Sequence, residues 1–339
     1  MMQEIQPGMI TIAREARGMT QQELAMQLHM HKTQVSRMES GELPVGKETL
    51  EALSIACSFP ATFFAHDPGT RQVQARFRRR QKVPSRLLSA LEAQCFIISR
   101  NADYLARALQ VEPQPLPILL PGKTASPPEL ATALRQLWQL DEGPLRSLAG
   151  LLEKHGILVS RFDFGTERVD SRSMITAAGH PIIFVNSQLT GDRQRFSLAY
   201  ELGQLLLNRE GYPADEKEVN RFAAELLMPA GAILSFFSEC VNLARLAEGK
   251  KHWKVSMISL LYRADDLGLV SANQKRYLLQ QFNQLRIRRT EPPELDVDAE
   301  ACTCLRGMLY QYLQQYDLGL LECCRHLCIT PTDLLHYYG

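Results

Sequence analysis

The sequence has no apolar run that approaches the roughly 20 residues needed to span a lipid bilayer. Its first residues, MMQEIQPGMI, lack the charged and then apolar layout of a signal peptide. The chain also has almost no excess of either charge, since 38 Lys and Arg face 37 Asp and Glu, for a formal net charge of +1. This balance excludes a general attraction to nucleic acid or membranes, so any such affinity must be local. We therefore expect a cytoplasmic protein.

Cysteine is present, but without the setting in which disulfides form. Eight Cys in a chain of 339 residues with no secretory signal are typical of reduced thiols or metal ligands. Hydrophobic residues make up 45% and charged residues 22% of the chain, as in soluble globular proteins. The length predicts two or three domains, each able to bury its own core.

The first strong pattern is a pair of short helices joined by a tight turn. Thr20 is a favourable N-cap for the helix QQELAMQL, and Glu23 completes a capping box. Residues 29–31 make the turn, and a second helix, KTQVSRMES, ends at Gly41. This is the layout of a helix-turn-helix.

These residues resemble the XRE (phage-repressor-like) family of DNA-binding domains, through R-x-x-R-G-M-T-Q-Q-E-L-A and V-S-R-M-E-S-G. The resemblance implies an all-α, lambda-repressor-like domain whose second motif helix enters the major groove. The residues that this helix would present to base edges are Lys32, Thr33, Gln34, Ser36 and Arg37. The alternative is a small helical bundle with solvated polar faces.

Two further residues bear on this interface. Gln21, at the N-terminus of the first motif helix, would contact a DNA phosphate. His31 stands at the N-cap of the second helix, where the family usually has a small hydroxyl residue, so we expect this helix to begin less firmly. Because one such module reads few bases, the resemblance also implies a homodimer on double-stranded DNA.

A dense basic run follows the predicted DNA-binding domain. It reads RFRRRQK from Arg76 to Lys82. Its arginines, Arg76, Arg78, Arg79 and Arg80, would contact phosphates beside the helix-turn-helix, or would form the solvated face of a connecting helix. Both interpretations stay open at this point.

The basic run leads into a connector. A helix is predicted at residues 85–109. Residues 111–128, VEPQPLPILLPGKTASPP, hold too many Pro for a continuous helix and predict an extended linker with a domain boundary.

From Glu129 the pattern becomes mixed. Helices are predicted in ELATALRQLWQL and LRSLAGLLEKH, and strands in GILVSRFDF and PIIFVN. In the next predicted helix, residues 193–208, apolar side chains recur at helical spacing, which brings Tyr200, Glu201 and Gln204 together along a neighbouring face.

Four segments of this region resemble the ImmA/IrrE-type peptidase domain, which has a zincin-like fold with a short sheet. They are GPLRSLAGLLEKHGILVSRFDFG, HPIIFVN, GDRQRFSLAYELGQLLLN and EVNRFAAELLMP. In that family the two His of H-E-x-x-H and a Glu before the last segment hold zinc, and the Glu of the motif polarises the metal-bound water. Fusion to an XRE module is a recurrent architecture of the family.

This chain departs from the family at the ligands themselves. Tyr200 and Gln204 stand in place of the two His, whereas Glu201 keeps the position of the base. The third ligand falls on Glu216, with Glu218 as the less favoured frame. Gln offers only a neutral amide oxygen, and the phenol of Tyr has a reference pKa of about 10, so neither replaces His for zinc. We expect no zinc, no other cofactor and no catalysis.

The altered motif leaves several arrangements open. Tyr200 and Gln204 could hydrogen-bond to each other, or could line a pocket from which Glu201 faces solvent. A zinc site rescued by distant imidazoles is the alternative. It would have to use His66, His155, His180, His252, His326 or His336.

The remainder of the chain predicts helices. Residues 250–271 resemble the segment that follows the peptidase core in the same family, and a packing helix with Ser256 as a cap is favoured over a second DNA contact. The last forty residues hold a group of soft metal ligands, namely Cys302, Cys304, Cys323, Cys324, His326 and Cys328. They could bind zinc or form a thiol switch. The helical periodicity of LGLLECCRHLC instead favours burial of these small side chains in a core.

The sequence therefore predicts a multidomain, mainly α protein with a small α+β domain. The expected parts are a DNA-binding domain (1–67), a basic and helical connector (68–128), a peptidase-like domain (129–232), a helical accessory region (233–290) and a Cys-rich helical region (291–339).

The expected function is transcription regulation by sequence-specific DNA binding, as a repressor or autoregulator, with an inert peptidase-like domain as sensor or docking site. Resemblance to fused regulators of this kind implies a toxin-antitoxin, prophage or phage-defence locus. The alternatives are an antitoxin that binds and neutralises a toxin encoded nearby, and an active zinc peptidase that cleaves a repressor.

Overall fold

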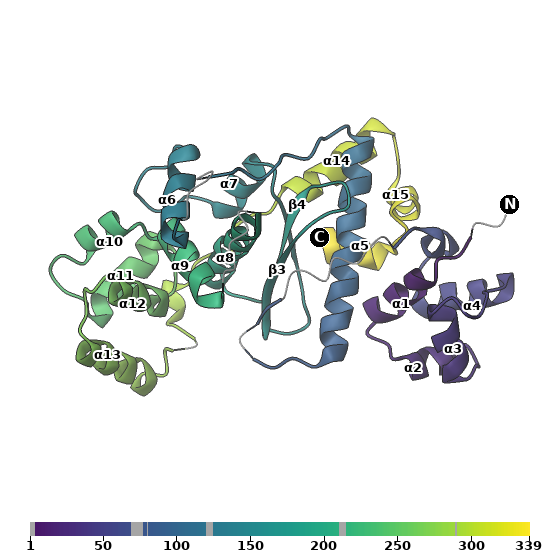
Figure 1. Ribbon diagram of the computed structural model, residues 1–339, viewed down its shortest axis with the longest axis horizontal. Helices are drawn as coiled ribbons and strands as arrows, with labels where there is room; N and C mark the ends of the chain where they lie inside the picture. The colour runs from purple at the N-terminus through teal and green to yellow at the C-terminus, as the bar shows by residue number, and fades with distance from the viewer. Residues whose placement is uncertain (1–3, 69–76, 80, 120–124, 210–214, 289) are drawn as a thin grey trace.

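The computed structural model describes residues 4–68, 77–79, 81–119, 125–209, 215–288 and 290–339. In these residues the chain forms sixteen α-helices, two 3-10 helices and one four-stranded sheet (Figure 1). The expected fold class, mainly α with a small sheet in the middle of the chain, is confirmed. None of these helices combines the length and the apolar character that a membrane span requires.

Four helices and a 3-10 helix make the N-terminal domain. They are α1 (Pro7–Ala16), α2 (Gln21–Gln27), α3 (Lys32–Glu39), α4 (Lys47–Cys57) and η1 (Ala61–Ala65). Leu24 of α2 and Val35 and Met38 of α3 are buried in one cluster. The two motif helices therefore share a core, as the sequence predicts.

A long helix, α5 (Ser85–Ala108), lies between the N-terminal domain and the sheet (Figure 1). It confirms the helix predicted at 85–109. Leu91, Ile98 and Leu105 recur at helical spacing along its buried face. Because α1 packs along α5, the N-terminal domain is attached to the rest of the molecule through this helix.

The sheet has the strand order β1-β3-β4-β2. Its strands are β1 (Arg78–Arg79), β2 (Leu158–Phe162), β3 (Val169–Ile175) and β4 (Pro181–Asn186). β4 pairs in parallel with β2 and antiparallel with β3. The two predicted strands are therefore confirmed, one over the whole of PIIFVN and one over the centre of GILVSRFDF.

Helices cover both faces of the sheet. Ile183 and Val185 of β4 belong to one hydrophobic cluster, whereas Ile182 and Phe184 belong to another. Successive side chains of a strand point to opposite faces, so the two clusters are the two sides of one sheet. The sheet is thus the middle layer between two helical layers.

The first layer contains the helices of the central region. They are α6 (Pro127–Leu137), α7 (Leu148–Lys154), α8 (Gly191–Arg209), α9 (Glu216–Leu227), α10 (Ala230–Phe236), α11 (Leu243–Trp253), α12 (Met257–Asp266) and α13 (Ala272–Gln284). α8 packs on β3 and β4 and also along α9. Ser256 caps α12 by accepting a hydrogen bond from the N–H of Ser259, which confirms the predicted cap. Residues 111–119 form no helix or strand, as predicted, and residues 120–124 of the linker lie outside the described residues.

The second layer contains α5 and the C-terminal helices, preceded by η2 (Pro293–Leu295). These helices are α14 (Cys304–Gln315), α15 (Leu320–Leu327) and α16 (Pro331–Tyr338). α14 lies against α5 and β2, and α16 also lies against β2. Cys323, Cys324 and Cys328 are buried in this layer, as the packing interpretation predicts.

Two strands are absent from the sequence-based prediction. β3 reads VDSRSMI, which lacks the apolar runs of β2 and β4, yet its first five residues are buried. It becomes a strand because β4 supplies its backbone partners and α8 covers its side chains. β1 is only two residues long and exists because it pairs with the edge of β3. Neither cause is visible in local sequence.

Candidate functional site

The helix-turn-helix begins with the capping box that the sequence predicts. Thr20 Oγ1 accepts a hydrogen bond from the N–H of Glu23 (3.2 Å), and Glu23 Oε2 accepts one from the N–H of Thr20 (2.6 Å). The backbone hydrogen bond from Thr20 is the main reason why the pKa of Glu23 lies below its usual value. The reciprocal bonds fix the start of α2 and hence the turn into α3.

The start of α3 is capped from one side. His31, at the N-cap, makes no side-chain capping bond, but its own N–H donates to Oε1 of Gln34 at 2.9 Å. The predicted departure at His31 is therefore partly compensated by Gln34. The side-chain oxygen of Gln34 is used in capping α3, so its amide NH₂ is the group that would contact a base.

The outer face of α3 carries most of the residues predicted to read DNA. The exposed ones are Lys32, Thr33, Ser36 and Arg37, and Gln34 is half-buried. Arg37 is paired only loosely, with Glu42 at 3.6 Å. Exposed ion pairs of this kind contribute little, so the guanidinium can exchange Glu42 for a base or a phosphate.

Gln21 is held by a small polar network. Its Nε2 donates to Oε2 of Glu39 at 2.7 Å, and Nε of Arg14 donates to Oε1 of the same carboxylate at 2.6 Å. A side-chain amide has two N–H donors, so one remains for a phosphate. The bond to Glu39 fixes the Gln21 side chain in position, and its contact with a phosphate stays a prediction.

The placement predicted for the basic run beside the helix-turn-helix is wrong for Arg78. Arg78 lies on β1, and its guanidinium donates to Oγ of Ser197 (3.1 Å) and Oδ1 of Asn220 (3.4 Å), on α8 and α9. Arg79 is exposed on the same strand, so no connecting helix forms at these two residues. The pairing of β1 with β3 draws this part of the run into the central domain. Arg76 and Arg80 lie outside the described residues.

The altered motif lies on α8. Nε2 of Gln204 donates to the hydroxyl of Tyr200 at 3.4 Å, which is one of the arrangements predicted. Burial raises the pKa of Tyr200 above its usual value, so the phenol is neutral at neutral pH. The guanidinium of Arg78 lies over the Tyr200 ring, 4.5 Å from its centroid.

Glu201 is engaged with the sheet. It accepts hydrogen bonds from Oγ of Ser171 (2.7 Å) and Oγ of Ser173 (2.6 Å), and it is only 1% exposed. The two serines alternate along β3 and so face the same side. The arrangement in which Glu201 faces solvent is therefore wrong, because β3 covers this side of α8. Burial raises the pKa of Glu201 above its usual value.

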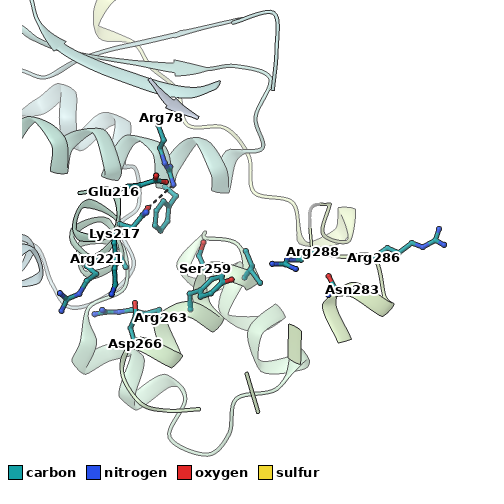
Figure 2. Close-up of a pocket in the computed structure, with 15 residues that line it drawn as sticks. Arg78, Glu216, Lys217, Arg221, Ser259, Arg263, Asp266, Asn283, Arg286 and Arg288 are labelled. Atoms are coloured by element: carbon teal, nitrogen blue, oxygen red, sulfur yellow. Dashed lines mark hydrogen bonds between the residues drawn. The ribbon is translucent and has the colours of Figure 1, made fainter. Parts of the chain in front are cut away.

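Glu216 and Glu218 lie at the start of α9. Glu216 is exposed and lines a pocket of about 1150 Å³ that Arg78 also lines (Figure 2). Glu218 pairs with Arg221 at 3.2 Å instead. Of the two residues predicted for the third ligand, Glu216 lines this pocket and Glu218 does not.

These side chains do not fit a zinc ion. The phenol of Tyr200 is protonated, Gln204 offers a neutral amide, and both oxygens of Glu201 accept hydrogen bonds from serines. Among the residues that the structure describes, no group of three or more His, Cys, Asp or Glu could hold a metal ion.

The distant imidazoles do not come to the motif. His155 is stacked on Trp138, and His252 is stacked on Phe236. The others lie in other environments: His66 beside Cys328, His326 on the Tyr312 hydroxyl, His336 against Phe162, and His180 buried at the start of β4.

The C-terminal Cys also have separate neighbours. Sγ of Cys328 lies 3.4 Å from Nε2 of His66, on the N-terminal domain. Burial raises the pKa of Cys302 to about 12 and that of Cys304 to about 11, so both thiols stay protonated at neutral pH. This favours structural thiols over reactive ones.

Comparison with known families agrees with the two resemblances found in the sequence. The helix-turn-helix family model HTH_3 matches residues 10–64. The Peptidase_M78 model, the IrrE N-terminal-like domain, matches residues 152–265. The chain is thus a fusion of an XRE-type helix-turn-helix with an IrrE N-terminal-like domain. No curated protein matches the chain.

Sequence reasoning missed two residues of this site and gave a third other partners. Ser171 and Ser173 lie on a strand that the sequence did not predict, and Arg78 was expected in the connector, in contact with phosphate or solvent. The only signal for Arg78 is that it belongs to a basic run, which does not indicate its partners. The alternation of two Ser in VDSRSMI is a weak signal for a polar strand face.

Proposed function

We propose that this protein regulates transcription by binding double-stranded DNA in a sequence-specific way, as a repressor or autoregulator, and that its peptidase-like domain is catalytically inert. The observation that carries the proposal is the outer face of α3. Lys32, Thr33, Ser36 and Arg37 are exposed there on a helix whose other face is buried. Side chains of these types read base edges in the major groove.

The state of the motif supports inertness. A hydrolytic zinc site needs three good ligands, an open position for water and a base that can reach that water. Here Glu201 is turned to Ser171 and Ser173, and Tyr200 and Gln204 bond to each other. The peptidase-like domain therefore acts as a sensor or docking site rather than as a hydrolytic enzyme.

A gel-shift with DNA from upstream of the gene that encodes this chain tests the DNA-binding part. Replacing Gln34→Ala and Arg37→Ala together should weaken specific binding about tenfold or more, because a good base contact is worth roughly 1–3 kcal/mol. Glu51→Ala, an exposed change on α4, is the control and should bind as the wild type does. Equal affinity of the double variant and the wild type would remove α3 as the reading helix.

Metal analysis of the purified full chain tests inertness. We expect less than stoichiometric zinc, unchanged by Glu201→Gln or Glu216→Gln. Stoichiometric zinc that both substitutions remove would show that the domain retains a metal site, and the inert-domain proposal would fall.

A further inference from the structure

Among the described residues that line the pocket beside the altered motif, basic side chains outnumber acidic ones. Six lining residues are basic and two are acidic. The basic ones are Arg78, Lys217, Arg221, Arg263, Arg286 and Arg288, and the acidic ones are Glu216 and Asp266. They come from β1, α9, α12 and the segment after α13, so the positive charge converges from parts far apart in the sequence. The excess is notable because the whole chain is almost neutral.

Two of these basic residues are neutralised where they stand. Arg263 is buried and bonded to Glu225, and Arg221 pairs with Glu218. Neither carboxylate lines the pocket. When Glu218 and Glu225 are added to the two acidic lining residues, the described residues at the pocket still include four acidic side chains against six basic ones.

Lys217 and Arg288 are two exposed cations on opposite sides of the pocket. Lys217 lies in the first turn of α9, and Arg288 follows α13. Figure 2 shows Arg288 pointing back toward the space in front of α9 and α12, whereas Arg286 extends away from it. Opposed cations across a concave surface concentrate positive potential between them.

Arg78 supplies the fixed donor of the pocket. Its guanidinium donates to Ser197 and Asn220 and lies over the rings of Phe196 (5.1 Å) and Tyr200 (4.5 Å). These contacts use two of its N–H donors and hold the planar, positively charged group in one orientation. Such a group suits the oxygens of a phosphate.

We propose that this pocket binds a small phosphate-bearing molecule, which is the effector of the regulator; this inference rests on the proposed function. The volume of about 1150 Å³ includes an open mouth and accommodates a ligand of metabolite size. A ligand with a di- or triphosphate group is favoured over one with a single carboxylate. Its several negative charges match the positive charges of Arg78, Lys217 and Arg288 together. The pocket beside the altered motif is thus a binding site for an anion.

The same residue connects the pocket to the DNA-binding domain. Arg78 belongs to β1, which lies in the chain between the N-terminal domain and α5. α5 in turn packs along α1. A ligand that bonds to Arg78 acts on the strand that precedes α5, and its binding can therefore favour one position of the helix-turn-helix over another.

Titration calorimetry on the full chain without DNA tests the site. The probes are pyrophosphate and ATP, with adenosine as the uncharged control. We expect both phosphates to bind, adenosine not to bind, and the affinity to fall as salt increases. Lys217→Gln combined with Arg288→Gln should weaken binding at least tenfold, and both changes are at exposed positions that leave the fold intact.

The matched control is Arg276→Gln, an exposed charge change on α13 outside the pocket. It should bind both probes as the wild type does. Absence of binding by both phosphates, or equal affinity of the Lys217/Arg288 variant and the wild type, would overturn the proposal. So would binding of a single-stranded oligonucleotide, but neither small probe, through Lys217 and Arg288, since the pocket would then be a nucleic-acid contact.

A gel-shift with and without pyrophosphate or ATP completes the test. A ligand that acts as effector must change the affinity for DNA in the wild type and not in the Lys217/Arg288 variant. Phosphate binding with unaltered DNA affinity would overturn the effector role. Failure of the α3 variants to lose DNA binding would refute the proposed function alone, because calorimetry is done without DNA.

Discussion

Arg17 and Asp333 form a two-point ion pair between the N-terminal domain and the last helix of the chain. The distances are 2.5 Å from Nη1 to Oδ1 and 2.8 Å from Nη2 to Oδ2. The same guanidinium donates to the carbonyls of Cys57 and Ser58 and lies 4.1 Å from the centroid of the Phe59 ring. One side chain therefore joins the end of α1, the end of α4 and the start of α16.

The pair makes stability depend on pH in a defined direction. Burial acts to raise the pKa of Asp333, but hydrogen bonds and the charge of Arg17 outweigh it, so the pKa lies below its usual value. A carboxyl whose folded pKa is depressed contributes stability above its unfolded pKa. That contribution is lost as pH falls through the folded pKa.

Asp333→Asn should therefore lower the free energy of unfolding by roughly 1–3 kcal/mol at pH 7, because a charge-assisted bidentate contact is lost. The difference from the wild type should shrink as pH falls below about 4, the reference pKa of the unfolded carboxyl, and on through the lower folded pKa. Urea denaturation at pH 7 and at pH 3 measures both values. Asp296→Asn, an exposed position, is the control, and a deficit that is equally large at the two pH values would contradict the assignment.

Glu201 is expected to show the opposite dependence. Burial raises its pKa above the usual value, so the folded state favours the protonated form more than the unfolded state does. Its contribution to stability is present at low pH and is lost as pH rises through the folded pKa. Glu201→Gln keeps the shape, and the amide can accept from one serine and donate to the other. The Gln variant should gain stability relative to the wild type between pH 5 and pH 8.

Urea denaturation across that range is the measurement, and Glu201→Ala is the comparison. The Ala variant leaves Ser171 and Ser173 without their buried partner and should lose roughly 1–3 kcal/mol. A Gln variant that becomes steadily less stable than the wild type as pH rises would refute the raised pKa.

Gly203 of α8 and Gly307 of α14 are both helical glycines, but they differ in the space around them. A Cβ at Gly203 would lie 2.8 Å from Cδ1 of Phe222 and 3.2 Å from Cγ1 of Val219, on α9. A Cβ at Gly307 would have no atom within 4 Å. Gly203→Ala should therefore destabilise the protein by roughly 1–3 kcal/mol. Gly307→Ala should stabilise it by up to about 1 kcal/mol, because Ala is the better helix former.

Thermal unfolding of the two variants gives the comparison directly. If Gly203→Ala unfolded at the same temperature as the wild type, then α8 and α9 would not approach as closely as the structure shows.

Local patterns were predicted well because their causes are local. The capping box of Thr20 and Glu23 and the largely apolar run of β4 depend on neighbouring residues alone. The substitution of both imidazoles was likewise evident from the motif. The arrangement of what remained was not, because β3 has a polar sequence and becomes a strand only through its partners β4 and α8.

The sequence by itself determined the two modules and the loss of the zinc ligands, since both are encoded in residue identity and spacing. Only the tertiary structure decided where the remaining polar groups point. It buried Glu201 against the two serines of β3, and it carried Arg78 into the pocket of the central domain. The physical reason is that a carboxylate and a guanidinium find their partners through long-range pairing of strands and helices, and periodicity along the chain carries no information about those contacts.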